Sequence, residues 1–204
     1  MGTEPQVERR RKWLGVGAAG VVIVFVVLVM TSVGGSGTAP NSVDGAFLTG
    51  MAPHHKSAIE MARIAETRAD HREVRDLATK IASDQLQEID QLNAIHQKAF
   101  GTPLPAAGGH GSLGLTAAQM GMEMDPSALR TAKPFDRTFI DMMVAHHQGA
   151  IRMARVELAQ GSDPETKGVA RAVISAQSGE IQQMNRWRQA WFGQPSPAGG
   201  IPSS

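Results

Sequence analysis

Methionine and histidine are the residues of this sequence whose types could do chemistry. The 204-residue chain has 11 Met and 7 His but no Cys. Thioether sulfur is a soft, neutral ligand that favours Cu(I) and Ag(I), whereas imidazole accepts Cu(I), Cu(II), Zn and other ions. The missing Cys excludes disulfides, zinc–thiolate sites and cysteine nucleophiles. A thioether–imidazole metal site suits an oxidising compartment, where thiolates would be oxidised.

Four of these Met and four of these His lie in a motif that the chain contains twice, 92 residues apart. Positions three, four and seven apart share one face of a helix. In the first copy Met51 precedes His54 by three residues, and Met61 follows His54 by seven. Each copy therefore places two thioethers and at least one imidazole along one stripe. The candidate metal ligands are Met51, His54, His55, Met61, Met143, His146, His147 and Met153.

The same residues also have a purely structural interpretation. Met at helical spacing is often a core residue, and this applies to Met61 and Met153 above all. A His can be a hydrogen-bonded structural residue, and adjacent side chains on a helix point about 100° apart. In each His-His pair, one ring can therefore be a ligand while the other makes a hydrogen bond.

Two glutamates also recur at the offset of 92, Glu88 and Glu180. Each precedes an Ile on the apolar side of its predicted helix, and a buried unpaired charge is costly. Each carboxylate therefore needs a partner. It either accepts a hydrogen bond from a His ring of the motif or forms an ion pair with Arg63 or Arg155.

Between the two copies lie further Met and His residues. His110 stands in a Gly-rich stretch, followed by three Met at alternate positions, Met120, Met122 and Met124. These Met either form a flexible soft-metal site or belong to a short amphipathic helix within residues 116–129. His71 and His96 have no counterpart in the other copy, so we expect both at the surface.

The elements that must position these residues are predicted to be four helices. Identity at the offset of 92 divides the domain into repeat one (44–101), a crossover (102–135) and repeat two (136–193). Each repeat has helical periodicity and a short central joint, which forces two antiparallel neighbours. Because neither hairpin can bury its apolar face alone, we expect an all-α four-helix bundle.

Local signals predict where these helices begin and end. Asp70 with Glu73 has the spacing of a capping box, and Asp163 precedes Pro164 as an N-cap. Gly101 and Gly193 are left-handed C-terminal stops. Pro53 is expected to kink the first helix, or the helix begins there and residues 44–51 form a separate turn.

The amino-terminal part predicts a membrane span. Residues 13–33 form a run of 21 residues without a charge, which is long enough to cross a bilayer. Residues 1–12 are basic, so we expect them to stay on the cytoplasmic side. The span is either a signal anchor, which we expect, or a long signal peptide that would leave a secreted protein. Residues 34–43 read as a flexible linker and residues 194–204 as a disordered tail.

Charge gives no sign of a nucleic-acid partner. The first 12 residues hold four of the 20 basic and two of the 19 acidic side chains, so 16 basic and 17 acidic groups remain. The chain has no Tyr and only 4% aromatic residues. The exported part is therefore neither basic nor rich in stacking residues.

The doubled pattern Phe-x-x-x-Met-x-x-His-His-x-x-Ala-Ile-x-Met-Ala, each time followed by Gln-x-x-Glu-Ile, resembles the domain-of-unknown-function 305 family over residues 44–193. The resemblance implies a ferritin-like four-helix bundle in bacterial exported or membrane-anchored proteins. It also implies an association of some members with copper binding and copper tolerance. The motif positions that carry over are the eight candidate ligands named above.

These features predict an exported, membrane-anchored protein that sequesters copper as Cu(I), or Ag(I), in storage or tolerance. We expect a metal ion and the membrane as partners and no enzymatic activity. The main alternative is a metal-free structural or interaction bundle at the cell surface. A di-iron redox enzyme is disfavoured because the Glu-x-x-His ligand motif does not occur in the sequence.

Overall fold

The computed structural model describes residues 39–106 and 111–203. The predicted basic segment, the predicted span over residues 13–33 and the first half of the predicted linker lie outside these residues, as does His110. None of the helices in the described part is both long and apolar enough to cross a membrane.

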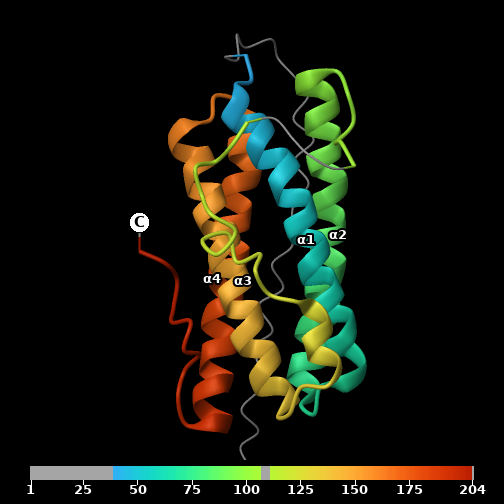
Figure 1. Cartoon of the computed structure of the whole chain (residues 1–204), viewed down its shortest axis with the longest axis vertical. Helices are drawn as coiled ribbons and strands as arrows, with labels where there is room; N and C mark the ends of the chain where they lie inside the picture. Colours follow the sequence, from blue (N-terminus) through green and yellow to red (C-terminus); the bar gives the residue numbers. More distant parts are fainter. Residues whose placement is uncertain (1–38, 107–110, 204) are drawn as a thin grey trace, which may run out of the picture. The chain divides into compact units, whose positions relative to one another are not determined.

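The described chain forms four long helices and one short 3-10 helix (Figure 1). α1 and α2 form one antiparallel hairpin, α3 and α4 form the other, and α1 packs against α3. The predicted all-α four-helix bundle of two hairpins is therefore confirmed. The elements are α1 (Ser42–Arg68), α2 (Arg72–Phe100), η1 (Pro126–Arg130), α3 (Phe135–Gln160) and α4 (Pro164–Phe192).

Most of the predicted helix ends are confirmed. Gly101 and Gly193 adopt the left-handed conformation, with φ of 76° and 82°, directly after α2 and α4. Asp163 caps α4 through the backbone N–H of Thr166. The separate turn before Pro53 is wrong, because α1 runs from Ser42 through Pro53 without interruption.

The predicted capping box at Asp70 is also wrong. α2 begins at Arg72, and its N-cap His71 makes no side-chain cap. Instead, the buried Asp136 of the other hairpin accepts from the backbone N–H groups of Asp70 and His71 at 2.9 and 2.8 Å. The free N–H groups before α2 are thus satisfied from across the bundle.

The same contact occurs at the opposite end of the bundle, on the equivalent residues 92 positions away. Asp44 of α1 accepts from the backbone N–H groups of Ser162 and Asp163, at 3.0 and 2.9 Å. Each hairpin therefore caps the joint of the other hairpin. These two carboxylates fix how the hairpins dock, and so how the His motifs of α1 and α3 face each other.

The core consists of two apolar clusters separated by a polar layer. One cluster contains Phe47 and Leu92, and the other contains Phe139 and Ile81. On each helix, polar residues lie between the members of the two clusters. The buried members of this layer, which we call the His layer, are His54, His55, His146, His147, Gln85 and Gln177.

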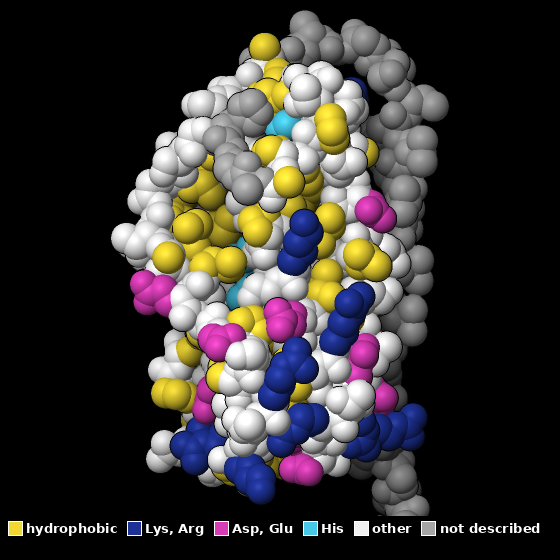
Figure 2. Space-filling model, turned by 45° about the vertical axis from the view of Figure 1, so that its right-hand side comes forward, with side chains coloured by type: hydrophobic (Ala, Val, Ile, Leu, Met, Phe, Trp, Pro, Cys, Tyr) yellow, Lys and Arg dark blue, Asp and Glu magenta, His cyan; other side chains and the backbone are white. Residues whose placement is uncertain are grey.

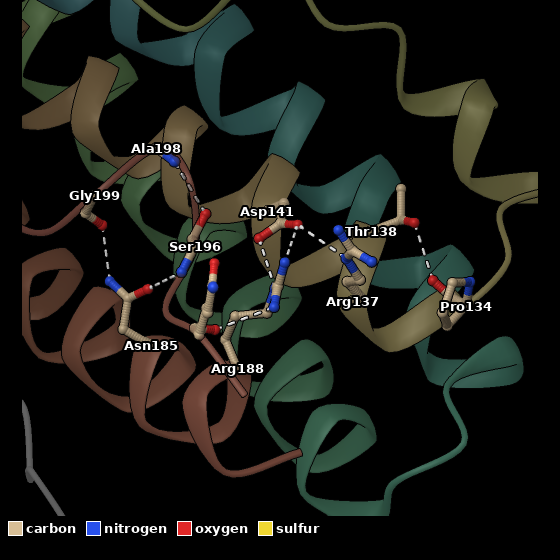
Figure 3. Close-up of polar contacts among 10 residues, drawn as sticks. Pro134, Arg137, Thr138, Asp141, Asn185, Arg188, Ser196, Ala198 and Gly199 are labelled. Atoms are coloured by element: carbon tan, nitrogen blue, oxygen red, sulfur yellow. Dashed lines mark hydrogen bonds and ion pairs between the residues drawn. The ribbon is translucent and has the colours of Figure 1, made fainter. Parts of the chain in front are cut away.

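Two connecting segments cover the bundle. In the crossover, Thr116 and Gln119 form the two hydrogen bonds of a capping box, at 2.9 and 3.2 Å, and residues 117–121 form turns. The short helix of this segment is the 3-10 helix η1. Residues 194–203, expected to be disordered, instead pack along α3 and α4 (Figures 1 and 3). Asn185 holds them by accepting from the N–H of Ser196 and donating to the carbonyl of Gly199, both at 2.8 Å.

Candidate metal centre

His54 of α1 and His146 of α3 face each other at the centre of the His layer. Their ring centroids are 3.8 Å apart, with the ring planes inclined by 41°. The side chains are 0% and 1% exposed. Because α1 and α3 are antiparallel, equivalent positions near the middle of the two helices meet, and the duplication brings one imidazole from each copy together.

The other two histidines of the motif are hydrogen-bonded to glutamates within their own hairpins. His55 Nε2 lies 2.7 Å from Glu88 Oε2, and His147 Nε2 lies 2.8 Å from Glu180 Oε2. Of the two kinds of partner predicted, both glutamates have the first: each accepts a hydrogen bond from a motif His, and neither pairs with Arg63 or Arg155. Arg155 donates to the carbonyl of Pro202 instead.

Five ring nitrogens of the His layer have no hydrogen-bond partner among the described residues, although they are buried. They are Nδ1 of His54, His55 and His147, and both Nδ1 and Nε2 of His146. Leaving one buried polar group unpaired costs about 1–3 kcal/mol. So many buried nitrogens without a protein partner in one layer are unusual, and groups of this kind pair with bound water or with an ion.

The hydrogen bonds made by three of these rings determine which nitrogen is available. A ring whose Nε2 faces a carboxylate or a carbonyl carries its proton there, so Nδ1 keeps its lone pair. This assigns free Nδ1 lone pairs to His54, His55 and His147. Lone pairs of neutral imidazole are the form that binds metals.

Burial also keeps the central pair neutral. Burial, followed by the charge of neighbouring His55, lowers the pKa of His54 to about 3. Burial, followed by the charge of His54, holds the pKa of His146 well below its usual value. At neutral pH both central rings are therefore uncharged, so no proton has to leave before either of them binds a metal ion.

The crossover makes the two halves of the layer unequal. The carbonyl of Met120 accepts from His54 Nε2 at 2.9 Å, whereas neither nitrogen of His146 is engaged. Gly149 permits this approach, because a Cβ there would lie 1.9 Å from the Met120 oxygen. The equivalent residue of repeat one is Ser57, so only α3 can receive the crossover backbone so closely.

The four methionines of the motif are buried on both sides of the His layer. Met51, Met61 and Met143 are 0% exposed and Met153 is 1% exposed. Met51 and Met153 belong to the apolar cluster on one side, and Met61 and Met143 to the cluster on the other. The layer is thus flanked by one thioether pair on each side.

This donor set suits a soft metal ion better than a hard one. Among the described residues, no three His, Asp or Glu side chains converge on a point where they could hold a metal. A site in the layer would therefore have to combine imidazole with thioether sulfur. Neutral nitrogen and sulfur donors in a dry core favour a monovalent soft ion such as Cu(I) or Ag(I) over Mg²⁺ or Ca²⁺.

The remaining His and Met residues lie elsewhere. His96, expected at the surface, is 0% exposed, and its Nδ1 lies 2.7 Å from the carbonyl of Thr102. His71 is 40% exposed and stacks on Trp191 at 3.8 Å. The crossover methionines Met120, Met122 and Met124 are all partly buried.

Comparison with known proteins gives a consistent result. Residues 44–188 match the family model "Domain of unknown function (DUF305)". Solved structures of CopM align over almost their whole length. The Cu(I)-bound form is 38% identical, covers 74% of this chain and 98% of its own, and has a TM-score of 0.62. CopM structures also exist in Ag-bound, Cu(II)-bound and apo forms. No curated protein sequence matches.

Two more distant structures share the fold. A DUF305 fragment from Deinococcus radiodurans is 28% identical, with 72% of this chain and 95% of that chain covered and a TM-score of 0.61. A DUF305 protein from Streptomyces coelicolor, inferred to be secreted, is 25% identical, with 76% and 96% covered and a TM-score of 0.62. Since the family model spans most of the chain and the CopM structures exceed 30% identity, this protein belongs to the DUF305 family.

Proposed function

We propose that this protein sequesters copper as Cu(I), and Ag(I) by the same chemistry, in the His layer of its bundle. The observation that carries the proposal is the set of five buried, unpartnered ring nitrogens between two pairs of buried methionines. CopM, of which the chain covers 98%, has been solved with Cu(I) and with Ag bound. We propose that this binding serves copper storage or tolerance.

Each ligand type has a distinct part in this proposal. His146 has two unpaired ring nitrogens, one of which carries a lone pair in the neutral ring, and the ring of His54, whose Nδ1 is also unpaired, lies 3.8 Å from it. The thioethers of the flanking methionines complete a neutral, soft donor set. The hydrogen bonds to Glu88 and Glu180 hold His55 and His147 in fixed orientations. Burial would keep Cu(I) away from water and oxidants.

We further propose that the bundle lies outside the cytoplasm, anchored through residues 13–33. The support is the charge-free run of 21 residues preceded by Arg9, Arg10, Arg11 and Lys12. An extracytoplasmic bundle would explain a metal site without Cys. If the leader is cleaved, the same bundle becomes a secreted protein with the same site.

A metal-free structural bundle is the competing function. The hydrogen bonds of His55 and His147 to glutamates are what that function requires. It does not account for His146, which is buried and donates or accepts no hydrogen bond among the described residues. A bundle selected only for stability would place an apolar residue there.

A titration separates these two functions. The full-length protein, held in detergent and reduced, would be titrated with Cu(I) against a competing chromophoric chelator. We expect tight binding that falls at least tenfold when Met143 and His146 are both changed to Leu. The matched control changes Met184, another fully buried Met of the core outside the motif, to Leu. If the unchanged protein bound Cu(I) no more tightly than the Met143→Leu, His146→Leu protein does, the copper function would be refuted.

A further inference from the structure

The outer groove between α3 and α4 is occupied by the end of the chain itself. Gln148 donates to the carbonyls of Ala198 and Gly200, at 2.7 and 2.6 Å, and Arg155 donates to the carbonyl of Pro202 at 2.6 Å. Asn185 adds the two hydrogen bonds described above (Figure 3). Side chains of α3 and α4 thus bind the backbone of an irregular segment rich in Pro and Gly.

The first hairpin has the equivalent groove and begins to bind its following segment in the same way. The N–H of Leu104 donates to Asn93 Oδ1 at 2.9 Å, as the N–H of Ser196 does to Asn185 Oδ1 at 2.8 Å, and both pairs differ by 92 positions. In the first hairpin the chain then leaves for the crossover, so it cannot follow the path of the carboxyl-terminal tail.

The residues that would hold such a segment are free in the first hairpin. Lys56 and Arg63 are the counterparts of Gln148 and Arg155. Both side chains are exposed, and neither makes a hydrogen bond or an ion pair with a described residue, whereas Gln148 is buried under the tail and Arg155 is half-buried. Lys56 and Arg63 therefore occupy the positions that bind the tail in the second hairpin, but no described segment of the chain is bound to them.

An open groove lies beside these two residues, between α1 and α2. It has a volume of about 720 Å³ and includes Ile59, Leu86 and Ile89 in its lining. Leu86 is 50% exposed, an unusual state for a large apolar side chain in this bundle. Ile89 is partly exposed, while its counterpart Ile181 is 0% exposed on the tail-covered hairpin.

The groove is basic. Lys56, Arg63, Arg68 and Arg130 line it, opposed by a single carboxylate, Glu60, which pairs with Arg130 at 3.6 Å. Figure 2 shows Lys and Arg side chains over the lower half of the face turned forward, with Asp and Glu side chains among them. The counterpart of Lys56 in the covered groove is the neutral Gln148, so the open groove differs from the covered one by favouring negative charge.

We propose that the α1–α2 groove is a docking site for a partner protein, which inserts a short irregular Pro- and Gly-containing segment that carries acidic side chains. Lys56 and Arg63 bind its carbonyls and carboxylates, as Gln148 and Arg155 bind the tail. Leu86 and Ile89 are covered by its apolar residues. This docking site is separate from the His layer and does not depend on the copper function.

Two labelled peptides test the proposal on the full-length protein in detergent by fluorescence anisotropy. One has the sequence of residues 194–204, and the other has the same sequence with Ala198→Glu and Ser203→Glu, which place carboxylates beside the positions bound by Gln148 and Arg155. We expect the acidic peptide to bind at least tenfold more tightly. The protein variant with Lys56→Gln and Arg63→Gln should reduce that difference to less than twofold, and Leu86→Asp should weaken both peptides.

The control protein variant is Arg72→Gln, which removes an exposed charge of α2 that pairs with Asp76 rather than lining the groove. It should bind the acidic peptide like the unchanged protein. Equal affinity for the two peptides, or an acidic peptide that binds the Lys56→Gln, Arg63→Gln protein undiminished, would overturn the proposal. Dimerisation of the full chain that Leu86→Asp abolishes would also overturn it, since a second copy would then occupy the groove.

Discussion

Replacing His146 with Leu should make the metal-free protein more stable. Both nitrogens of His146 are buried and have no hydrogen-bond partner among the described residues, so the ring has lost its contacts with bulk water without gaining a hydrogen bond to the protein. Leu is an apolar side chain of similar size that removes this cost, which is about 1–3 kcal/mol for a buried unpaired polar group. For a domain of this size, each kcal/mol raises Tm by about 2–4 °C.

The adjacent histidine provides a matched comparison with the opposite sign. His147 is as buried as His146, but its Nε2 donates to Glu180 at 2.8 Å. Burial alone would raise the pKa of Glu180, yet the His147 hydrogen bond and Lys80 hold it below its usual value. Replacing His147 with Leu leaves the Oε2 atom of Glu180 without its hydrogen-bond partner, while Lys80 Nζ stays 3.3 Å from Oε1. The free energy of unfolding should therefore fall by about 1–3 kcal/mol.

The assay is denaturant unfolding of the full chain in detergent with a chelator, repeated with excess Cu(I). Copper at 1,000 times its Kd should stabilise the unchanged protein by about 4.1 kcal/mol. This exceeds the gain of about 1–3 kcal/mol from His146→Leu, and copper should add little to the His146→Leu protein. The order of stability of these two proteins should therefore reverse on adding copper. If His146→Leu destabilises the metal-free protein as much as His147→Leu does, the ring is structural and our reasoning about it is refuted.

Three further predictions concern the frame around the site. Gly149→Ala should push the crossover off α3 and speed hydrogen exchange of the Gly121 amide, whereas Gly168→Ala, with nothing within 4 Å, should raise helix stability by about 0.5–1 kcal/mol. Burial, followed by contact with Asp44, raises the pKa of Glu157 to about 8, so the unfolding free energy should fall as pH rises from about 4.5 to 8, and Glu157→Gln should remove that dependence. Asp136→Ala should lower the free energy of unfolding by about 1–3 kcal/mol and should speed hydrogen exchange of the first amides of α2. Unchanged exchange would contradict the cross-hairpin cap.

The helices and their pairing could be predicted because their causes are local. Periodicity, Gly101 and Gly193 set the ends of the helices, and the repeat implied two equivalent hairpins. The cross-hairpin caps could not be recognised in the same way, because Asp44 and Asp136 act on residues more than 60 positions away. The one sequence feature that could have indicated these caps is that Asp44 and Asp136 stand at the same position at the start of each repeat.

The sequence could indicate which residues lie together in the candidate site, but not the asymmetry between its two halves; their role as metal ligands stays a prediction. The spacing of Met and His placed eight candidates on two helix stripes, and the structure brings His54 and His146 together while burying all four Met. The contact of Met120 with His54 depends on a crossover backbone whose path no periodicity encodes. Gly149 in place of Ser57 was the sequence difference that could have indicated it. The burial of His96 also depends on a distant carbonyl, that of Thr102.

The most direct test of the central claim is a crystal structure of the Cu(I)-loaded protein, with copper located by anomalous diffraction. Our account predicts copper within the His layer, bound by a nitrogen of His146 and at least one thioether of the motif, and no copper there in the His146→Leu protein. Copper found only outside the layer, with His146 unliganded in the fully loaded protein, would contradict it.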